Sequence, residues 1–264
     1  MNRALSLRRL LALVLLMIWL AAALGPARAD ETRRRLRVPI LMYHYISTPP
    51  DDADRYRRDL SVSPEQFEAQ LRWLRDNGYT AISLEDVARA LSAGTPLPER
   101  PVVLTFDDGY DDAYRNAFPL LQKHAMTGTF FVVTEWIDEG RAGYLTWDQA
   151  REMAAAGMSI QSHSRTHPDL SRGCDYDCLV YQMLGSVQTI EAEIGIRPRV
   201  FCYPAGRYNR EVMTVLEHVG IIAAVTTQGG TLHVSERPLQ LHRVRVRGTT
   251  DLGDFAWMVR DWRG

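Results

Sequence analysis

The feature that most constrains this chain is a regular alternation of short apolar runs with helical patterns, which begins at Val38 and continues to the C-terminus. The apolar runs have the length of β-strands, and turn-forming or polar residues flank them. They cover residues 38–43, 80–82, 102–106, 128–133, 158–161, 199–203, 221–225 and 241–246. Strands that alternate with helices form largely parallel sheets, so the pattern predicts an α/β fold.

The helices between these runs have recognisable starts. Ser63 is a suitable N-cap, Pro64 suits the first helical position, and Gln66 is placed to complete a capping box. Similar capping patterns begin at Ser83 and Thr146. Further helices are expected over residues 176–193, 209–218 and 251–260.

About seven or eight strand–helix repeats within this length fit a (β/α)7–8 barrel. An open, doubly wound sheet is the structural alternative. The first expected strand is not followed by the pattern Gly-x-Gly-x-x-Gly, which argues against a dinucleotide-binding fold.

The N-terminal segment has a different character. Arginines precede an apolar run at residues 10–24, and a small-x-small triplet ends at Ala29. This is the plan of a secretory signal peptide that is cleaved after Ala29. An uncleaved anchor is the alternative, although the run is short for a membrane span. We therefore expect an exported protein, periplasmic or secreted, that stays membrane-associated only if the signal is not cleaved.

The predicted organisation is a signal peptide at residues 1–29, a basic flexible lead-in at 30–37 and one catalytic domain at 38–264. The chain is 46% hydrophobic with a formal net charge of −1, so we expect no nucleic-acid partner, and no stable transmembrane span after cleavage. Cys174 and Cys178 are close enough in sequence for a local disulfide, a question that the sequence leaves open.

Polar residues gather where the expected strands end. His44 follows the first strand, Asp107 and Asp108 follow the third, His163 follows the fifth, and Tyr203 ends the sixth. Barrel enzymes build their active sites at the carboxyl ends of the strands. These residues therefore mark a candidate active site.

Two spacings in this set indicate a metal-dependent hydrolase. Asp107 and Asp108 are adjacent, so one carboxylate can ligate a metal while the other addresses a water, although Asp-Gly turns are also common without any function. His163 and His167 are four residues apart and can face a single point. We expect Asp108, His163 and His167 to bind a divalent metal and Asp107 to act as the general base.

Two segments resemble a known family. Residues 105–109, Thr-Phe-Asp-Asp-Gly, and residues 163–167, His-Ser-Arg-Thr-His, are similar in order and separation to the first two motifs of polysaccharide deacetylases of carbohydrate esterase family four, the NodB homology domain. The resemblance covers essentially the whole mature chain. It implies a distorted barrel of the NodB type, a zinc-like ion for which cobalt or nickel could substitute, and deacetylation of N-acetylated sugars.

A proton donor for the departing amine is also required, and His44 and His242 compete for this role. Residues 39–44, Pro-Ile-Leu-Met-Tyr-His, resemble the first strand of the circularly permuted branch that includes poly-N-acetylglucosamine deacetylases. That resemblance implies that His44 is the general acid. His242 lies in a segment that only loosely resembles the final Leu-x-His motif, which makes it the runner-up.

Residues 201–206, Phe-Cys-Tyr-Pro-Ala-Gly, resemble the third motif with two departures. The family places arginine at the position of Cys202 and tyrosine at the position of Ala205. A backbone N–H of Ala205 could still contact the oxyanion. The missing arginine would orient the catalytic aspartate, and Arg243 is the candidate replacement. Cys202 itself is expected to be a buried, inert thiol, and Tyr203 a substrate contact.

The expected function is hydrolysis of N-acetyl groups on poly-N-acetylglucosamine or another envelope glycan, so the expected partner is an acetylated polysaccharide. Trp147, at a helix start, is a further candidate for substrate contact. An O-acetyl esterase and an inactive glycan-binding homologue are the alternatives. A glycosidase is disfavoured, because adjacent carboxylates are poorly placed to flank one glycosidic bond.

Overall fold

The computed structural model describes residues 33–261. The expected signal peptide, with its cleavage site, lies outside the described residues, as do residues 30–32 of the expected lead-in. Within 33–261, no helix combines the length and the apolar character that a membrane span requires.

Seven parallel strands close into a barrel, and a short eighth strand pairs with one of them outside the closed ring. Around the barrel the order is β2 (Ile40–Tyr43), β10 (Leu241–Arg245), β8 (Ala223–Gly229), β7 (Val200–Cys202), β6 (Ser159–Ser162), β5 (Thr129–Val132) and β4 (Pro101–Phe106). Pairing of β2 with β4 closes the ring, and the short β3 (Thr80–Ala81) pairs with the start of β4. The predicted (β/α) barrel is confirmed, and the closing pair excludes an open sheet.

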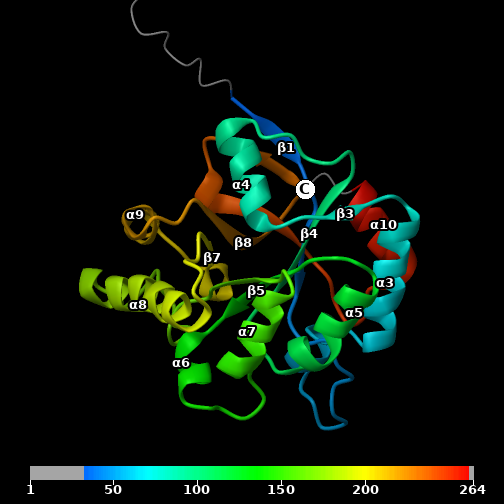
Figure 1. Cartoon of the computed structure of the whole chain (residues 1–264), viewed down its shortest axis with the longest axis horizontal. Helices are drawn as coiled ribbons and strands as arrows, with labels where there is room; N and C mark the ends of the chain where they lie inside the picture. The colour runs from blue at the N-terminus through cyan, green and yellow to red at the C-terminus, as the bar shows by residue number, and fades with distance from the viewer. Residues whose placement is uncertain (1–32, 262–264) are drawn as a thin grey trace, which may run out of the picture. The chain divides into compact units, whose positions relative to one another are not determined.

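Helices connect the strands and cover the outside of the barrel (Figure 1). The α-helices are α2 (Arg55–Asp59), α3 (Pro64–Asp76), α4 (Leu84–Ala93), α5 (Phe118–Lys123), α6 (Thr134–Asp138), α7 (Trp147–Ala155), α8 (Tyr176–Ile194), α9 (Arg210–Val219) and α10 (Leu252–Arg260). A π-helical turn, η1 (Ala113–Ala117), precedes α5, and 3₁₀ turns form η2 (Pro204–Gly206) and η3 (Pro238–Gln240).

The capping logic seen in the sequence explains where three helices begin. Complete capping boxes open α3 at Ser63, α4 at Ser83 and α7 at Thr146. In each box, the hydroxyl of the cap residue accepts a hydrogen bond from the backbone N–H of the third helical residue. The side chain of that third residue accepts one from the backbone N–H of the cap residue. The sequence therefore locates these helix starts to the residue.

One pair of strands was not expected from the sequence. β1 (Arg35–Arg37) pairs antiparallel with β9 (Leu232–Val234), and buried His233 bonds through Nε2 to the Val38 carbonyl at 2.9 Å. The prediction of a flexible lead-in is therefore wrong for residues 35–37. Its basic composition suggested solvation, but backbone pairing with a segment almost 200 positions away holds it in place.

A disulfide joins Cys174 to Cys178 at the start of α8, which answers the question that the sequence left open. The cap residue Asp175 lies within the closed loop and accepts a bond from the Cys178 N–H at 3.0 Å. The crosslink therefore fastens the first turn of the helix to the loop that precedes it.

Alternation along the strands places polar side chains inside the barrel near its carboxyl end. On β4, Val103 packs in the interior cluster, whereas Leu104 and Phe106 pack against the outer helices. Thr105 continues the interior row two residues after Val103, and Asp107 follows it. The apolar interior thus ends in a polar layer.

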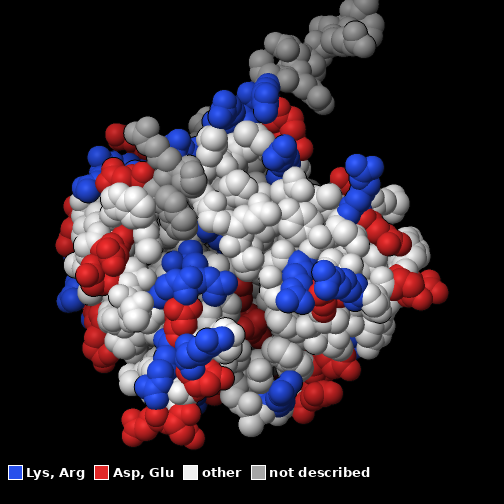
Figure 2. Space-filling model, turned by 180° about the vertical axis from the view of Figure 1, so that it is seen from behind, with Lys and Arg blue, Asp and Glu red and all other residues white. Residues whose placement is uncertain are grey.

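Charged side chains gather around a hollow on one face of the molecule (Figure 2). On the face opposite to that of Figure 1, basic side chains lie on both sides of a hollow in which acidic side chains are visible (Figure 2). The formal net charge of −1 therefore hides strong local charge.

Candidate active site

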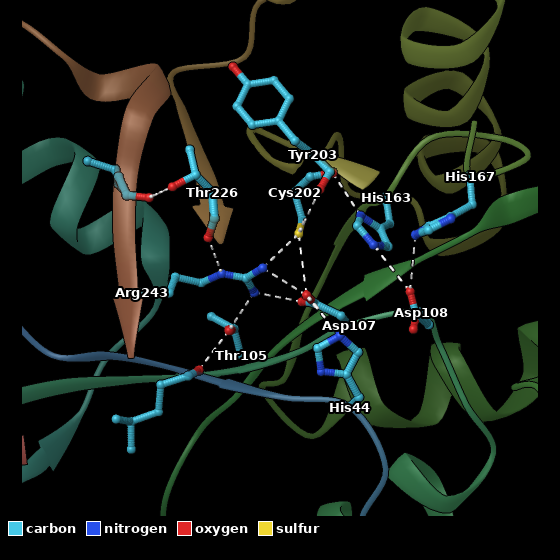
Figure 3. A network of polar contacts seen from close by, with 12 residues as sticks. His44, Thr105, Asp107, Asp108, His163, His167, Cys202, Tyr203, Thr226 and Arg243 are labelled. Atoms are coloured by element: carbon cyan, nitrogen blue, oxygen red, sulfur yellow. Dashed lines mark hydrogen bonds and ion pairs between the residues drawn. The ribbon is translucent and has the colours of Figure 1, made fainter. Parts of the chain in front are cut away.

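The carboxyl ends of several barrel strands bring the predicted chemical groups together (Figure 3). Asp107 and Asp108 directly follow β4, His163 directly follows β6, and His44 directly follows β2. Arg243 reaches them from β10. Because all these strands are parallel, their carboxyl ends meet at one face of the barrel.

A bidentate ion pair between Asp107 and Arg243 lies at the centre of the site. Nη1 of Arg243 donates to Oδ1 at 2.7 Å, and Nη2 donates to Oδ2 at 2.8 Å. The same guanidinium donates to the Thr226 carbonyl, the Thr105 hydroxyl and the Cys202 sulfur. All five guanidinium donors are thus engaged, which fixes the orientation of the carboxylate.

This pair sets the charge of Asp107. Burial alone would raise the pKa of its carboxyl group, but the adjacent Arg243 guanidinium has the opposite effect, and the pKa is lowered well below the ordinary value. Asp107 is therefore an anion at neutral pH and can accept a proton. The structure places Arg243 where the sequence analysis expected an arginine that orients this aspartate.

Cys202 is buried, as the sequence predicts, and it also contacts the charged pair. Its Sγ lies 3.6 Å from Oδ2 of Asp107 and 3.3 Å from Nη2 of Arg243. Burial raises the pKa of the thiol, so it is neutral. Cysteine is small enough to leave room beside Asp107 for the guanidinium that arrives from β10.

Asp108, His163 and His167 form a group that could hold a metal ion, since one donor atom of each lies within 4.8 Å of the others. Oδ1 of Asp108 is 3.2 Å from Nε2 of His163 and 3.5 Å from Nε2 of His167. Nδ1 of His163 bonds to the Cys202 carbonyl at 2.7 Å, which requires a proton on Nδ1 and leaves the Nε2 lone pair for a cation. One carboxylate oxygen and two imidazole nitrogens suit a divalent metal ion.

The backbone around these groups is strained. Four of the five non-glycine residues with positive φ within 33–261 lie here: Asp108, Ser164, His167 and Ala205, with φ of 73°, 70°, 60° and 52°. Such conformations cost about 1–3 kcal/mol each and persist only where their surroundings impose them. Strain concentrated at one end of the barrel is typical of a functional site.

His44 lies beside the central pair, with Nε2 at 3.8 Å from Oδ2 of Asp107. Burial lowers the pKa of the imidazole, although the two neighbouring aspartates raise it. Of the two histidines considered as proton donors, His44 is the one that the structure brings to the site.

The other candidate acid, His242, faces away. It adjoins Gly230, with its ring centroid 6.5 Å from that of His233, on the opposite side of β10 from Arg243. Side chains alternate along a strand, so neighbouring residues 242 and 243 cannot both face the barrel interior. The role proposed for His242 as runner-up acid is therefore not supported.

Of the two predicted substrate contacts, Tyr203 lies in the core, whereas the role of Trp147 stays a prediction. Tyr203 is fully buried beneath α8 and α9, stacks on Tyr208 and donates its hydroxyl to the Leu239 carbonyl at 3.0 Å. Figure 3 shows it pointing away from Asp107. Trp147 is half-buried against the outer core and donates to Asp138 at 2.9 Å. Side chains alternate at the end of β7, so Cys202 faces the barrel interior and Tyr203 faces the core beneath the outer helices.

Ala205 lies in the turn η2, directly beyond the end of β7. Its side chain is exposed, and its φ of 52° lies in the left-handed region. The turn reverses the chain immediately after the strand that carries Cys202. The position suits a backbone donor at the rim of the site, as the resemblance implied.

A row of aromatic rings beside the candidate metal-binding group was missed from the sequence. Tyr45 stacks on Tyr110, with ring centroids 3.7 Å apart, and the row continues through Tyr144 and Trp136. The ring of Trp136 lies 5.7 Å from that of His167. Tyr45 and Tyr110 each follow a strand end closely, so the rule that identified His44 and Asp108 would also have found them.

Comparison with known proteins gives the family. The family model of polysaccharide deacetylases matches residues 94–224. YxkH of Bacillus subtilis, which carries the name of a polysaccharide deacetylase, is 35% identical over 216 residues, which are 82% of this chain and 74% of that protein. This chain belongs to the polysaccharide deacetylase family.

Other relatives agree with this assignment. The Streptococcus pyogenes deacetylase PplD, solved in complex with acetate, has a TM-score of 0.79 and 31% identity, covering 86% of this deacetylase and all of PplD. The poly-β-1,6-N-acetyl-D-glucosamine N-deacetylase of Escherichia coli is 25% identical over 249 residues, 79% of the present chain. The chain spans only 37% of that longer relative.

Proposed function

We propose that this deacetylase hydrolyses N-acetyl groups on an amino-sugar polymer of the cell envelope. The observation that carries the proposal is an ionised carboxylate, Asp107, which two hydrogen bonds hold in place. It lies next to a group of donors that suits a divalent cation: Asp108, His163 and His167. Amide hydrolysis needs a base for the water and an electrophile for the carbonyl, and this arrangement can supply both.

Each residue then has a distinct task. Asp107 accepts a proton from the attacking water, and Arg243 keeps the carboxylate ionised and aligned. His44, on the other side of Asp107, carries a proton to the departing amine. The Ala205 backbone N–H donates to the oxyanion that develops on the acetyl carbonyl.

The metal is part of the proposal. The donor set fits a zinc-like ion, because His163 is held in the tautomer that presents Nε2 and Asp108 lies between both imidazoles. When bound, such an ion supplies a Lewis acid that polarises the acetyl carbonyl.

The names of the relatives support one choice of polymer, and the N-terminal sequence supports one choice of compartment. Proteins similar to this one in Escherichia coli and Staphylococcus aureus are named for N-deacetylation of poly-β-1,6-N-acetyl-D-glucosamine, so oligomers of that sugar are the first substrates to assay. We infer export through the signal peptide at residues 1–29, ahead of a catalytic domain at 38–264. A mature N-terminus that begins at Asp30 in the exported protein would support this.

The test is mass spectrometry of acetylated oligosaccharides incubated with the enzyme before and after chelation. We expect a loss of one acetyl group per event, a new free amine, and recovery of the activity when zinc, cobalt or nickel is added back. Release of a free hydroxyl in place of an amine would identify an O-acetyl esterase and contradict the proposal.

Variants separate the proposed roles. Asp107→Asn should keep its metal and lose turnover by about 10²-fold or more, as expected for a general base, whereas His163→Ala should lose the metal as well.

The proton donor has its own test. His44→Ala should lower the rate strongly with metal retained. His242→Ala is the matched control, since it removes an imidazole outside the site, and should behave like wild type. Equal rates for His44→Ala and wild type would remove His44 from the mechanism.

A further inference from the structure

The last barrel strand presents an unusual series of cations to the active-site end. Residues 243–247 read Arg-Val-Arg-Val-Arg, and both valines are buried against the outer helices. Arg243 faces the opposite way and crosses the barrel interior to reach Thr105 and Asp107 on the β4 side. Alternation therefore places Arg245 on the same face as Arg243, one step nearer the mouth of the site.

Two of these three arginines have a carboxylate partner. Arg243 pairs with Asp107, and Arg247 pairs with Asp59. Among residues 33–261, the guanidinium of Arg245 between them has neither a hydrogen bond nor an ion pair, although the residue is half-buried. A guanidinium carries five donors, and those of Arg245 are not among the buried polar atoms without a partner, so they remain open to an acceptor from outside the chain.

The surroundings of Arg245 favour an anion. Burial, together with repulsion from Arg247 and Arg243, lowers the pKa of its guanidinium. The two acidic groups that raise this pKa, Asp107 and Asp59, are each already engaged by another arginine. Arg245 also pairs in register with Met42 on β2, two residues before His44, so it lies on the side of the barrel that carries the proposed proton donor.

We propose that Arg245 binds a carboxylate or phosphate group that the glycan carries close to the scissile acetamide, so that acidic glycans are preferred over neutral ones. This inference rests on the proposed N-deacetylase function and narrows its substrate class. Guanidinium groups pair with both oxyanions through two parallel hydrogen bonds, which gives geometric selectivity as well as affinity.

The experiment compares kcat/KM for three acetylated oligosaccharides of equal length. One is neutral, one alternates the N-acetylated sugar with a uronic acid, and one carries a phosphate monoester on the neighbouring sugar. Wild type should prefer at least one acidic substrate, mainly through KM, and added salt should reduce the preference. Arg245→Gln should lower the ratio of acidic to neutral kcat/KM by about tenfold or more, the effect expected for a lost charge-assisted pair.

Two control variants keep the test specific. Arg245→Lys should retain part of the preference, because it keeps the charge but loses the fork of donors. Arg247→Gln removes an exposed arginine two residues further along the same segment and should leave the ratio at the wild-type value. Thermal unfolding of each variant identifies any loss of the fold.

Several results would overturn the inference. A wild-type enzyme that prefers the neutral substrate, or an equal loss on all three substrates in Arg245→Gln, would exclude a role in recognising the acidic glycan. Weaker inhibition by acetate in Arg245→Gln, with the ratio unchanged, would assign the residue to the product instead. If the wild-type enzyme releases no amine from any acetylated glycan, the proposed N-deacetylase function is wrong. This outcome differs from the ones above, in which the enzyme is active and only the role of Arg245 is wrong.

Discussion

At the scale of single residues, the site shows how one side chain can replace another from a different strand. The third motif of the family expects arginine at position 202, where this chain has cysteine, and a guanidinium nevertheless reaches Asp107 from position 243. The two positions lie on strands separated by β8 in the barrel. What the site preserves is the contact with the carboxylate, whichever strand supplies it.

Replacing Arg243 with lysine tests whether that contact is geometric or only electrostatic. Lysine keeps a positive charge but cannot hold both carboxylate oxygens together with Thr226, Thr105 and Cys202. We expect kcat to fall by about tenfold or more, since small misplacements of a catalytic group are costly, while bound metal and KM change little. The measurement is steady-state kinetics combined with metal analysis.

Arg197→Lys is the matched control, because Arg197 pairs with Glu191 at the surface. It should leave kcat unchanged. Full activity in Arg243→Lys would mean that Asp107 needs only a nearby charge and no defined orientation.

At the scale of elements, the short turns beyond the strands position the reacting groups. The turn η2 holds Ala205 at a φ of 52°, and the next residue, Gly206, has a φ of 69°. A Cβ atom at Gly206 would lie 2.1 Å from Oγ1 of Thr227 on β8. The turn is therefore pressed closely against the neighbouring strand, and glycine is required there.

Gly206→Ala should consequently move the Ala205 backbone away from its position and lower kcat. Gly220→Ala provides the comparison, because Gly220 also has a positive φ, of 89°, at the end of α9, but has no atom within 4 Å of an added Cβ. Both variants should lose about 1 kcal/mol of unfolding free energy from left-handed strain, and Gly206→Ala should lose more because its Cβ collides with Thr227. A similar kcat for the two variants would show that η2 does not position the oxyanion donor.

The sequence predicted elements better than it predicted which way side chains face. All eight expected strands and three capping boxes are present, because period and capping are local properties. The β1–β9 pair was missed because its partners are far apart in the chain. Tyr203 and His242 were misplaced because a strand end does not reveal which of two adjacent residues faces inward. Arg243 was identified only because the family motif has an arginine at the position of Cys202, so that another arginine was needed to contact Asp107.

At the scale of the whole molecule, the site ties the barrel together. Asp108 follows β4, whereas His163 and His167 follow β6, and the central pair links β4 to β10, the last strand to enter the barrel. A ligand that binds these groups only when they are assembled stabilises the folded chain over the unfolded chain. Metal binding should therefore be measurable as global stability, independently of turnover.

The expected size of this effect follows from mass action. A metal present at a hundred times its dissociation constant adds about 2.7 kcal/mol to the free energy of unfolding. For a domain of this size each kcal/mol shifts Tm by roughly 2–4 °C, so chelation should lower the Tm by roughly 5–10 °C. Calorimetry with and without chelator measures the shift, and readdition of zinc should reverse it.

Two variants decide whether the shift arises from the proposed ligands. Asp107→Asn should have a lower Tm than wild type throughout, because it leaves buried Arg243 unpaired, yet it should keep the shift on chelation. His167→Ala removes a half-buried imidazole and should lose the shift. If His167→Ala responds to chelation as strongly as wild type does, the stabilising metal binds elsewhere, and the assignment of Asp108, His163 and His167 as its ligands is wrong.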